Sequence, residues 1–522
     1  MALEGETVVH DFLENSARLR PTKVAVVHDS VRATYKQINA QANGLACWLR
    51  KQGVSAGDRI IILLENSVEY VISYYGALKA GGVAVPLNSD VTAERFTAFL
   101  VETEPTVVIS DVKFGKMFSD LHPDIAGKQK IVMKGVRFPG GSLQGSVVPW
   151  EEALRDETDC NPGRTINESA LAGIMYTSGS SGKAKGVMLS HRNIVVNTRS
   201  IVSYLELKED DVLMVVLPFF YVMGKSLLNT HFAVGGTVVI NNRFAFPAAV
   251  VEQMVSERVT GFSGVPSTYA YLLHRSSLPT YKDKLVSLRY CSQAGGHMSS
   301  MVKEQLLQAL PTHTQIYVMY GATEASARLT YVEPERLRSK IDSIGRPIPG
   351  VVVKVLDEAG SELPPGAQGE LVATGANIML GYWKDVESTS RVLDAGGYHT
   401  GDLGYRDEDG YYYITGRKDS LLKVGGHRVS PQGIEDALMN TKLLVEVAVV
   451  GVEDKLLGKR VVAFAVPICG ETSDKDILAS CCSLLPRHEL PSEIRLVRSL
   501  YKKSNGKIDH ARCLEIFAGS PV

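Results

Sequence analysis

The chain has 522 residues, of which 45% are hydrophobic and 22% are charged, and its formal net charge is −1. That length exceeds a single compact core, so we expect several domains, and the near-neutral charge argues against a dedicated nucleic-acid binder. Seven cysteines without a C-x-x-C pair, and no apolar run near the about 20 residues of a membrane helix, favour a cytoplasmic protein with reduced thiols and no integral membrane segment.

Helices alternate with short apolar strands in the first part of the chain. The spacing of apolar residues predicts helices over 35–53 and 67–82, each ending at glycine. A buried strand is predicted over 58–65, and further strands are predicted over 83–88 and 105–111. This alternation is typical of an α/β domain with a parallel sheet.

The pattern of predicted secondary structure changes in the later part of the chain. Helices and strands alternate again over 185–310. From about residue 345 the sequence becomes rich in predicted strands and turn residues. After residue 418 a new α+β pattern begins. We therefore expect the α/β class: a large N-terminal domain, 1–418, with two α/β subdomains and a small β-rich subdomain at about 345–418. A small mobile α+β C-terminal domain, 419–522, follows.

A segment rich in serine, glycine and lysine, TSGSSGKAKG at 177–186, directly follows the apolar LAGIMY. Glycines and hydroxyl side chains can wrap donors around phosphate oxygens, and lysines add positive charge. The spacing differs from Walker A, because Gly179 and the Gly182-Lys183 pair are too close together. Such a composition also suits a flexible surface loop.

With its flanks, YTSGSSGKAKGVMLSH resembles the phosphate loop of the adenylate-forming superfamily, which includes acyl- and aryl-CoA synthetases, nonribosomal adenylation domains and luciferases. Two serines replace the family's threonines and keep the hydroxyls, while Ala184 replaces a proline. The resemblance implies that the nucleotide is bound by Thr177, Ser178, Gly179, Ser180, Ser181, Gly182, Lys183 and Lys185.

The segment YGATE at 320–324 matches another motif of this family. The resemblance implies that Tyr320 and Gly321 bind the nucleotide, with the aromatic ring on adenine. It further implies that Thr323 meets the α-phosphate and that Glu324 holds Mg²⁺, a role that suits a carboxylate near phosphates. By itself this short segment fits a turn equally well.

Two further matches concern adenine and ribose. Gly295 and Gly296, in CSQAGGHM, resemble the segment that lines the adenine. Asp402, in a Thr-Gly-Asp motif, resembles the carboxylate that accepts hydrogen bonds from both ribose hydroxyls, and Arg417 resembles an arginine that reaches ribose or phosphate.

The last matches lie in the C-terminal region. The resemblance implies a hinge at Asp419, passage of the pantetheine arm of coenzyme A beside Gly425 and Gly426, and a catalytic lysine at Lys507 in KKSNGKID. A lysine in a polar tail is usually just solvated, so only its place in the ordered series supports that role.

The segment LPFFYVMG at 217–224 resembles an element that forms part of the family's acyl pocket, with Tyr221 in place of the usual histidine. We expect Phe220, Tyr221, Gly224 and the following Lys225 to border that pocket. Lys225 is either a surface lysine or a counter-charge for a second acidic group of the substrate or for the acceptor's phosphates. No aspartate lies between 217 and 229, which disfavours an α-amino acid substrate.

The resemblance implies two half-reactions: a carboxylate displaces pyrophosphate from ATP in the presence of Mg²⁺, and a thiol then displaces AMP. The thiol belongs to coenzyme A or to the phosphopantetheine of an acyl-carrier protein. A luciferase-like oxygenase and a non-catalytic adenylate-binding protein are more distant alternatives. No catalytic histidine is required, so we interpret the histidines at 191, 231, 297 and 399 as structural.

Overall fold

The computed structural model describes residues 7–119, 121, 129–135, 147–163, 166–177, 184–454, 458–470, 472–503 and 506–519. The chain divides into two compact units. Unit one comprises Met1–Asn242, Ala322–Arg328 and Gly375–Ser390, and unit two comprises Arg243–Gly321, Leu329–Thr374 and Arg391–Val522. The domain boundary that the sequence predicts between residues 418 and 419 falls inside unit two and stays a prediction.

Unit one contains a sheet of eight strands in the order β19-β9-β8-β4-β3-β5-β6-β7. The strands from β8 to β7 run parallel, whereas β9 and β19 are antiparallel additions at one edge. Both faces of the central strands are buried, as the apolar runs predict. The strands are β3 (Arg59–Leu63), β4 (Val83–Pro86), β5 (Val107–Asp111), β6 (Lys130–Lys134), β7 (Val147–Pro149), β8 (Leu171–Thr177), β9 (Lys185–Ser190) and β19 (Gly381–Tyr382).

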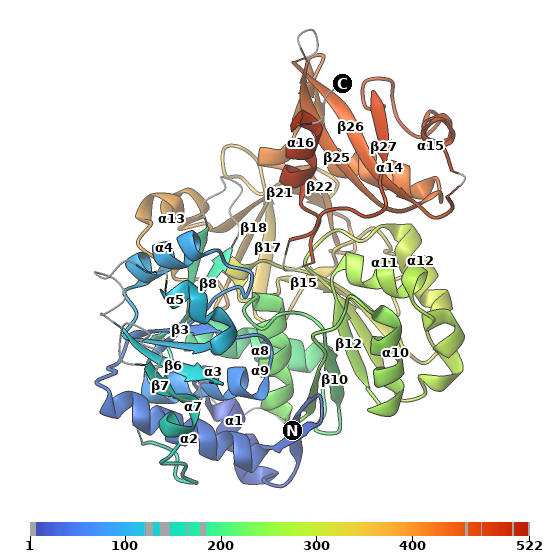
Figure 1. Cartoon of the computed structure of the whole chain (residues 1–522). Helices are drawn as coiled ribbons and strands as arrows, with labels where there is room; N and C mark the ends of the chain where they lie inside the picture. Colours follow the sequence, from blue (N-terminus) through green and yellow to red (C-terminus); the bar gives the residue numbers. More distant parts are fainter. Residues whose placement is uncertain are drawn as a thin grey trace. The chain divides into compact units, whose positions relative to one another are not determined.

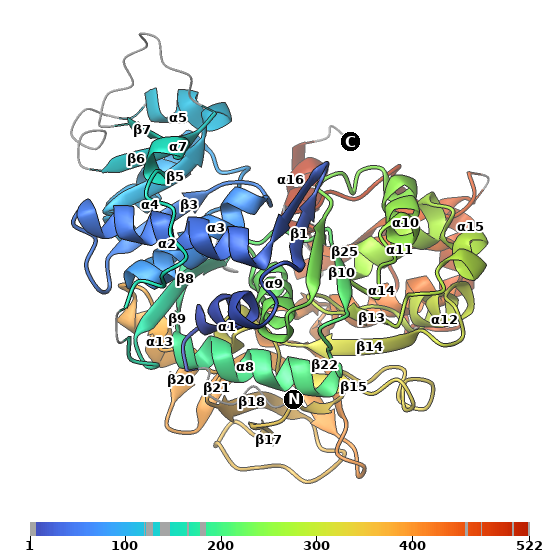
Figure 2. The same cartoon turned by 90° about the horizontal axis from the view of Figure 1, so that it is seen from below.

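Helices α2 (Tyr35–Lys51) and α3 (Val68–Ala80) pack side by side (Figures 1 and 2), and α3 contacts strands β3 and β4 of this sheet. Thr34 caps the first of them through a capping box, which satisfies donors that the first turn leaves free. Gly81 ends the second in the left-handed conformation, with φ of 88°. Both helices and the strands predicted beside them are therefore confirmed.

The remaining strands of unit one are β10, β11, β1 and β2, paired in that order. Beside them α8 and α9 contact each other, and α9 is buried along nearly its whole length. The bounds are β1 (Val24–His28), β2 (Val31–Thr34), β10 (Val212–Val215), β11 (Thr237–Ile240), α1 (Asp11–Leu19), α4 (Ala93–Thr103), α5 (Gly115–Ser119), α7 (Trp150–Ala153), α8 (His191–Tyr204) and α9 (Val222–Val234).

Unit two begins with a sheet in the order β16-β15-β14-β13-β12, in which the last three strands are parallel. Strands in the order β17-β18-β21-β20 follow, with β22 beside β21, as the turn-rich sequence predicts. The pairs β18–β21, β20–β21 and β21–β22 are antiparallel. The bounds are β12 (Gly261–Gly264), β13 (Tyr290–Gln293), β14 (Gln315–Tyr320), β15 (Thr330–Val332), β16 (Arg346–Pro347), β17 (Val351–Leu356), β18 (Gly369–Gly375), β20 (Leu393–Asp394), β21 (Gly397–Arg406), β22 (Tyr412–Arg417), α10 (Pro247–Ser256), α11 (Pro266–Arg275), α12 (Ser300–Ala309) and α13 (Val386–Val392), which crosses from unit one.

The C-terminal part of unit two is an α+β arrangement around the long hairpin of β25 and β26, whose inner residues form their own hydrophobic core. The α+β pattern predicted after residue 418 is present here, and the α/β class with a small C-terminal α+β part is confirmed. The bounds are β23 (Leu422–Val424), β24 (His427–Val429), β25 (Leu444–Asp454), β26 (Gly458–Pro467), β27 (Glu493–Leu496), α14 (Pro431–Asn440), α15 (Asp474–Cys481) and α16 (His510–Gly519).

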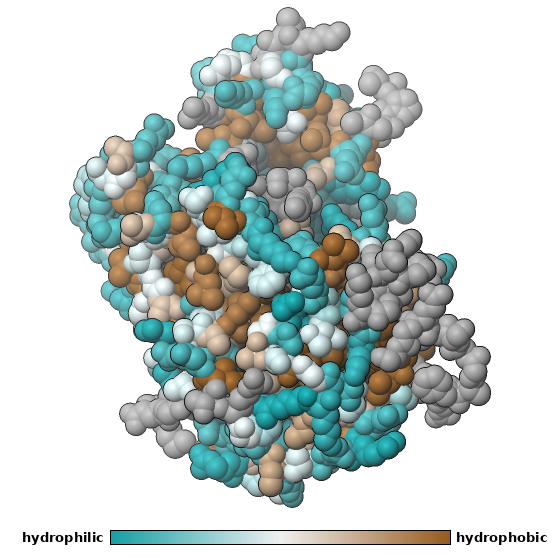
Figure 3. Space-filling view, turned by 90° about the vertical axis from the view of Figure 1, so that its left-hand side faces the viewer, coloured by the Kyte–Doolittle hydropathy of each residue, from teal (hydrophilic) through white to brown (hydrophobic). Residues whose placement is uncertain are grey.

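The face drawn in Figure 3 mixes hydrophilic and hydrophobic residues. Across the described ranges, none of the helices combines the length and the apolar character that crossing a bilayer requires. All seven cysteines are free thiols, three of them buried. Thiols in this state agree with the sequence-based expectation that the cysteines form no disulfide framework.

Candidate active site

Strands β8 and β9 hold the two ends of the predicted phosphate loop. Thr177 ends β8 and pairs with Lys185, the first residue of the antiparallel strand β9. The Thr177 hydroxyl lies 3.5 Å from the Lys185 carbonyl oxygen, to which it donates. Residues 178–183 of the prediction, from Ser178 to Lys183, lie outside the described residues.

Tyr382, a residue that the sequence analysis did not identify, contacts both Glu324 and Lys185. The Tyr382 hydroxyl donates a hydrogen bond to the Glu324 carboxylate at 2.8 Å, and the Lys185 ammonium lies 4.9 Å from the centre of the Tyr382 ring. Thr323 is buried at the start of the 3-10 turn Thr323–Ala325, and the Met379 amide donates to the Glu324 carbonyl oxygen. The fold of unit one therefore brings Glu324 and Lys185 to one tyrosine, Tyr382.

The only local signal for Tyr382 is a Gly-Tyr-Trp sequence after an apolar run. Its strand, β19, has two residues and pairs with β9 through Tyr382 and Val187. A strand that short has no periodicity to detect, so its partner strand is decided by the tertiary fold.

In unit two, Asp402 lies between Tyr320 and Arg417. The Tyr320 hydroxyl donates to one carboxylate oxygen of Asp402, and the Arg417 Nε lies 3.1 Å from the other. Strands β21 and β22 place Asp402 directly opposite Arg417 in their register. Burial raises the pKa of Asp402, and the positive charge of Arg417 opposes that rise. Burial, together with Asp402, holds the pKa of Tyr320 well above its ordinary value.

A cavity of about 660 Å³ in unit two is lined by four of the predicted residues, namely Gly295, Gly296, Arg417 and Lys507. Gly295 has φ of 86°, a left-handed conformation that favours glycine. Asp402 does not line this cavity, but its partner Arg417 does, and the charge of Lys507 lowers the pKa of Asp402.

Backbone contacts fix the segment that carries Lys507. The Lys503 amide donates to the Lys507 carbonyl oxygen at 2.8 Å, and the Gly506 amide donates to the Lys503 carbonyl oxygen at 2.8 Å. The Ser267 hydroxyl, at the start of α11, donates to the Gly506 carbonyl oxygen at 2.6 Å. The position of Lys507 at the cavity thus depends on main-chain bonds that a change of its side chain leaves in place.

Gly425 and Gly426 form the tight turn between β23 and β24, with φ of 55° and 87°. Two successive positive φ angles are typical of a two-residue hairpin turn. Asp419 lies in the 3-10 turn Lys418–Ser420, and its side chain is outside the described part of the structure. The hinge role of Asp419 and the channel role of the two glycines stay predictions.

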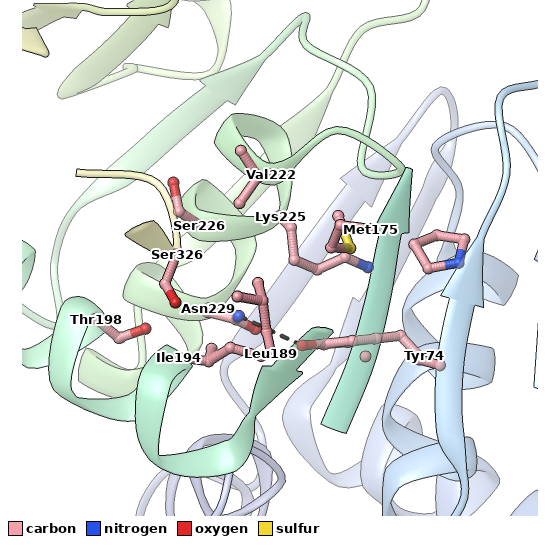
Figure 4. Close-up of a pocket in the computed structure, with 13 residues that line it drawn as sticks. Tyr74, Met175, Leu189, Ile194, Thr198, Val222, Lys225, Ser226, Asn229 and Ser326 are labelled. Atoms are coloured by element: carbon pink, nitrogen blue, oxygen red, sulfur yellow. Dashed lines mark hydrogen bonds between the residues drawn. The ribbon is translucent and has the colours of Figure 1, made fainter. Parts of the chain in front are cut away.

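A smaller cavity of about 20 Å³ lies in unit one beside α9 (Figure 4). Of the four residues predicted for the acyl pocket, Lys225 is the one that lines it. Phe220 and Tyr221 are half-buried just before α9, and Gly224 is buried in its first turn. A side chain at Gly224 would collide with the carbonyl group of Pro218, so this close approach requires glycine.

The four histidines that we interpreted as structural have protein partners. Buried His191 accepts a hydrogen bond from the Val9 amide at 3.1 Å, and burial lowers its pKa to about 4. His231 is buried in α9, and His399 lies between two carboxylates. His297 pairs with Asp436 at 2.6 Å and also lines the larger cavity.

Comparisons with known proteins show which family the chain resembles. Residues 13–383 match the family model described as "AMP-binding enzyme", and residues 433–507 match its C-terminal domain. The long-chain-fatty-acid–CoA ligase of Bacillus subtilis is 30% identical, covering 97% of this chain and 94% of the relative. Among solved structures, the anthranilate CoA ligase AuaEII in complex with anthranoyl-AMP has a TM-score of 0.88 at 25% identity, covering 98% and 97% of the two chains. ATP-bound MatB from Rhodopseudomonas palustris has a TM-score of 0.84 at 27% identity, covering 97% and 99%.

This α/β fold with a small C-terminal part matches solved structures of adenylate-forming ligases. The chain belongs to the AMP-binding enzyme family. It is an AMP-forming acid–thiol ligase of the acyl-CoA synthetase type, so the resemblance read from its motifs is confirmed.

Proposed function

We propose that this enzyme activates a carboxylic acid with ATP and Mg²⁺ and transfers the acyl group to coenzyme A. The observation that carries the residue assignment is the cavity of unit two, where Lys507, Arg417, Gly295 and Gly296 meet. The ATP bound to MatB supports ATP as the nucleotide, and the CoA ligase names of the relatives support coenzyme A as the thiol. The seven free cysteines support a reducing compartment such as the cytoplasm.

Asp402 is proposed to bind the ribose. A carboxylate accepts hydrogen bonds from two adjacent hydroxyls, and Asp402 is held in place by Arg417 and Tyr320. Because its side chain is only 13% exposed, water competes weakly for those bonds. Gly295 and Gly296 leave space for the flat adenine to approach the backbone.

Glu324 is proposed to hold Mg²⁺ together with the phosphates of ATP. Magnesium in nucleotide sites is usually bound through one or two carboxylates plus substrate phosphates, so a dedicated cage is not required. The half-buried Glu324 fits that donor set, because its carboxylate is oriented by the Tyr382 hydroxyl. When bound, the ion neutralises part of the phosphate charge.

In the first half-reaction an oxygen of the substrate carboxylate forms a bond to the α-phosphorus, and pyrophosphate leaves with the electron pair of the broken P–O bond. An anion approaches a polyanion, so electrostatic repulsion is the main barrier. Lys507 is proposed to offset the charge that develops at the α-phosphate, and Thr323 and Lys185 to position the phosphates.

In the second half-reaction the thiolate of coenzyme A attacks the acyl carbonyl, and AMP leaves with the electron pair of the broken C–O bond. Asp419 is proposed as the hinge that exchanges Lys507 for the turn at Gly425 and Gly426 between the two steps. Asp419→Pro is then expected to spare adenylate formation and to impair thioester formation.

The test supplies purified enzyme with ATP, Mg²⁺ and a panel of carboxylic acids, and measures pyrophosphate release. AMP formation is then compared with coenzyme A and with an acyl-carrier protein as acceptor. We expect pyrophosphate release with at least one acid and acceleration of AMP formation by coenzyme A. Acceleration by the carrier protein alone would replace coenzyme A as acceptor, and absence of pyrophosphate release across the panel would overturn the proposed function.

A further inference from the structure

Lys225 is a fully buried lysine whose ammonium group faces the small cavity of unit one. The residue is 4% exposed, and its side chain leaves α9 and extends across the cavity toward the strand that carries Met175 (Figure 4). Its Nζ donates a hydrogen bond to the Tyr70 hydroxyl at 2.8 Å and lies 3.6 Å from the centre of the Tyr74 ring. Burial alone drives its pKa well below the ordinary value.

Within the part of the chain that the structure describes, no carboxylate lies within ion-pair distance of Lys225. Lys79 is another buried lysine of unit one, and it is 1% exposed. The Lys79 ammonium pairs with Glu14 at 2.7 Å and donates to the side-chain oxygens of Asn39 and Asn43, each at 2.8 Å. Unit one therefore surrounds one buried lysine with acceptors and leaves the other facing aromatic rings and a cavity.

Leaving an ammonium group in such surroundings is costly unless a partner is supplied, because burial disfavours the charged form. Aromatic faces compensate only part of that cost. The rest of the cavity wall combines apolar side chains with uncharged polar side chains, the latter from Thr198, Ser226, Asn229 and Ser326. None of the lining residues carries a negative charge that would balance the ammonium group. The missing partner is therefore expected to arrive with a ligand.

The place of this cavity indicates which ligand that is. Lys225 and Ser226 lie on the helix that follows the motif of the acyl pocket, and Ser326, two residues after Glu324, also lines the cavity. The volume of about 20 Å³ holds little more than one water molecule, so it accommodates the end of a substrate and not a long chain or a ring.

We propose that Lys225 determines specificity by binding a second carboxylate at the far end of the acid that this enzyme activates. The inference rests on the proposed function and narrows it to short acids that carry two carboxyl groups. One carboxyl group reacts with ATP, and the other pairs with the Lys225 ammonium group at the cavity. The distance between the two binding points then selects the length of the acid, and the Lys225 ammonium selects its charge.

The experiment measures kcat/KM for pyrophosphate release with a homologous series of straight-chain α,ω-dicarboxylic acids and with the monocarboxylic acids of equal carbon number. Wild-type enzyme is expected to prefer the diacid over the monoacid by about 10² to 10³-fold in kcat/KM at one optimal length. The monoacid leaves the buried ammonium without its charged partner, and such a loss costs an effect of this size. In Lys225→Met, which keeps the volume and removes the charge, the preference is expected to disappear and the matched monoacid to become the better substrate.

Lys79→Met is the matched control. It removes a buried ammonium that does not line the cavity, so it is expected to lower thermal stability and to leave the diacid-to-monoacid ratio unchanged. Because a ratio is independent of the amount of folded enzyme, partial unfolding of either variant does not obscure the result. An unchanged ratio in Lys225→Met, or a wild-type preference for monoacids at every length, would overturn the inference while leaving acid activation intact. Absence of pyrophosphate release with every acid would instead refute the proposed function.

Discussion

Replacing Lys507 by alanine tests the assignment of the catalytic lysine. The segment that carries it is held by main-chain bonds among Lys503, Gly506 and Lys507 and by the hydroxyl of Ser267, all of which survive the substitution. The loss is therefore expected to be electrostatic. One preorganised donor in a reaction centre contributes about 3–4 kcal/mol, which corresponds to a decrease of about 10² to 10³-fold in the rate of adenylation. Because Lys507 is only half-buried, we expect the lower end of that range.

The assay is ATP–pyrophosphate exchange, which reports the first half-reaction alone. Thioester formation from a supplied acyl-adenylate serves as the second readout and is expected to stay within a few-fold of wild type, because Lys507 is assigned to the first step. Lys503→Ala, in the same segment, is the matched control and keeps the backbone bond to the Lys507 carbonyl oxygen. Exchange at a near wild-type rate in Lys507→Ala would refute the assignment, as would equal losses in the two variants.

Three further predictions concern binding and stability. Asp402→Asn removes the charge that faces Arg417 and the proposed ribose site, and KM for ATP is expected to rise about 10 to 100-fold; an unchanged KM would contradict the ribose role. Glu324→Gln is expected to shift the Mg²⁺ dependence of pyrophosphate exchange to higher concentration, and coincident Mg²⁺ titrations would contradict the metal role. Because burial holds the pKa of Lys225 below 10.5, the unfolded chain binds more protons between the two pKa values, and the free energy of unfolding rises with pH across that window. That rise is expected to be absent in Lys225→Met, and parallel curves from denaturant unfolding at several pH values would contradict it.

Much of the secondary structure followed from local patterns. The helix over 35–53 was predictable because its apolar residues have helical spacing and a glycine follows, and α2 ends at Lys51 within two residues of that limit. The strand at 58–65 was predictable from an unbroken apolar run, which marks burial on both faces. Strand β19 was not predictable, because two residues carry no periodicity.

The site also contains residues that motifs predicted and contacts that only the tertiary structure decided. Asp402 and Arg417 were identified from short motifs. Their ion pair depends on the register of β21 and β22, which cannot be predicted from those motifs. Tyr382 was missed altogether, since its role arises from a hydrogen bond to Glu324, a residue 58 positions away in the chain.

The sequence by itself determined the family chemistry of this protein, because glycines, hydroxyls and charged residues in fixed order are what phosphate and ribose recognition demands. It left open whether Lys225 is a surface lysine or a buried one. Only the tertiary structure decided that, by packing Tyr70 and Tyr74 against the ammonium group and placing no described carboxylate beside it. The physical reason is that the desolvation of a charge depends on all of its neighbours, and those neighbours come from segments that are far apart in the chain.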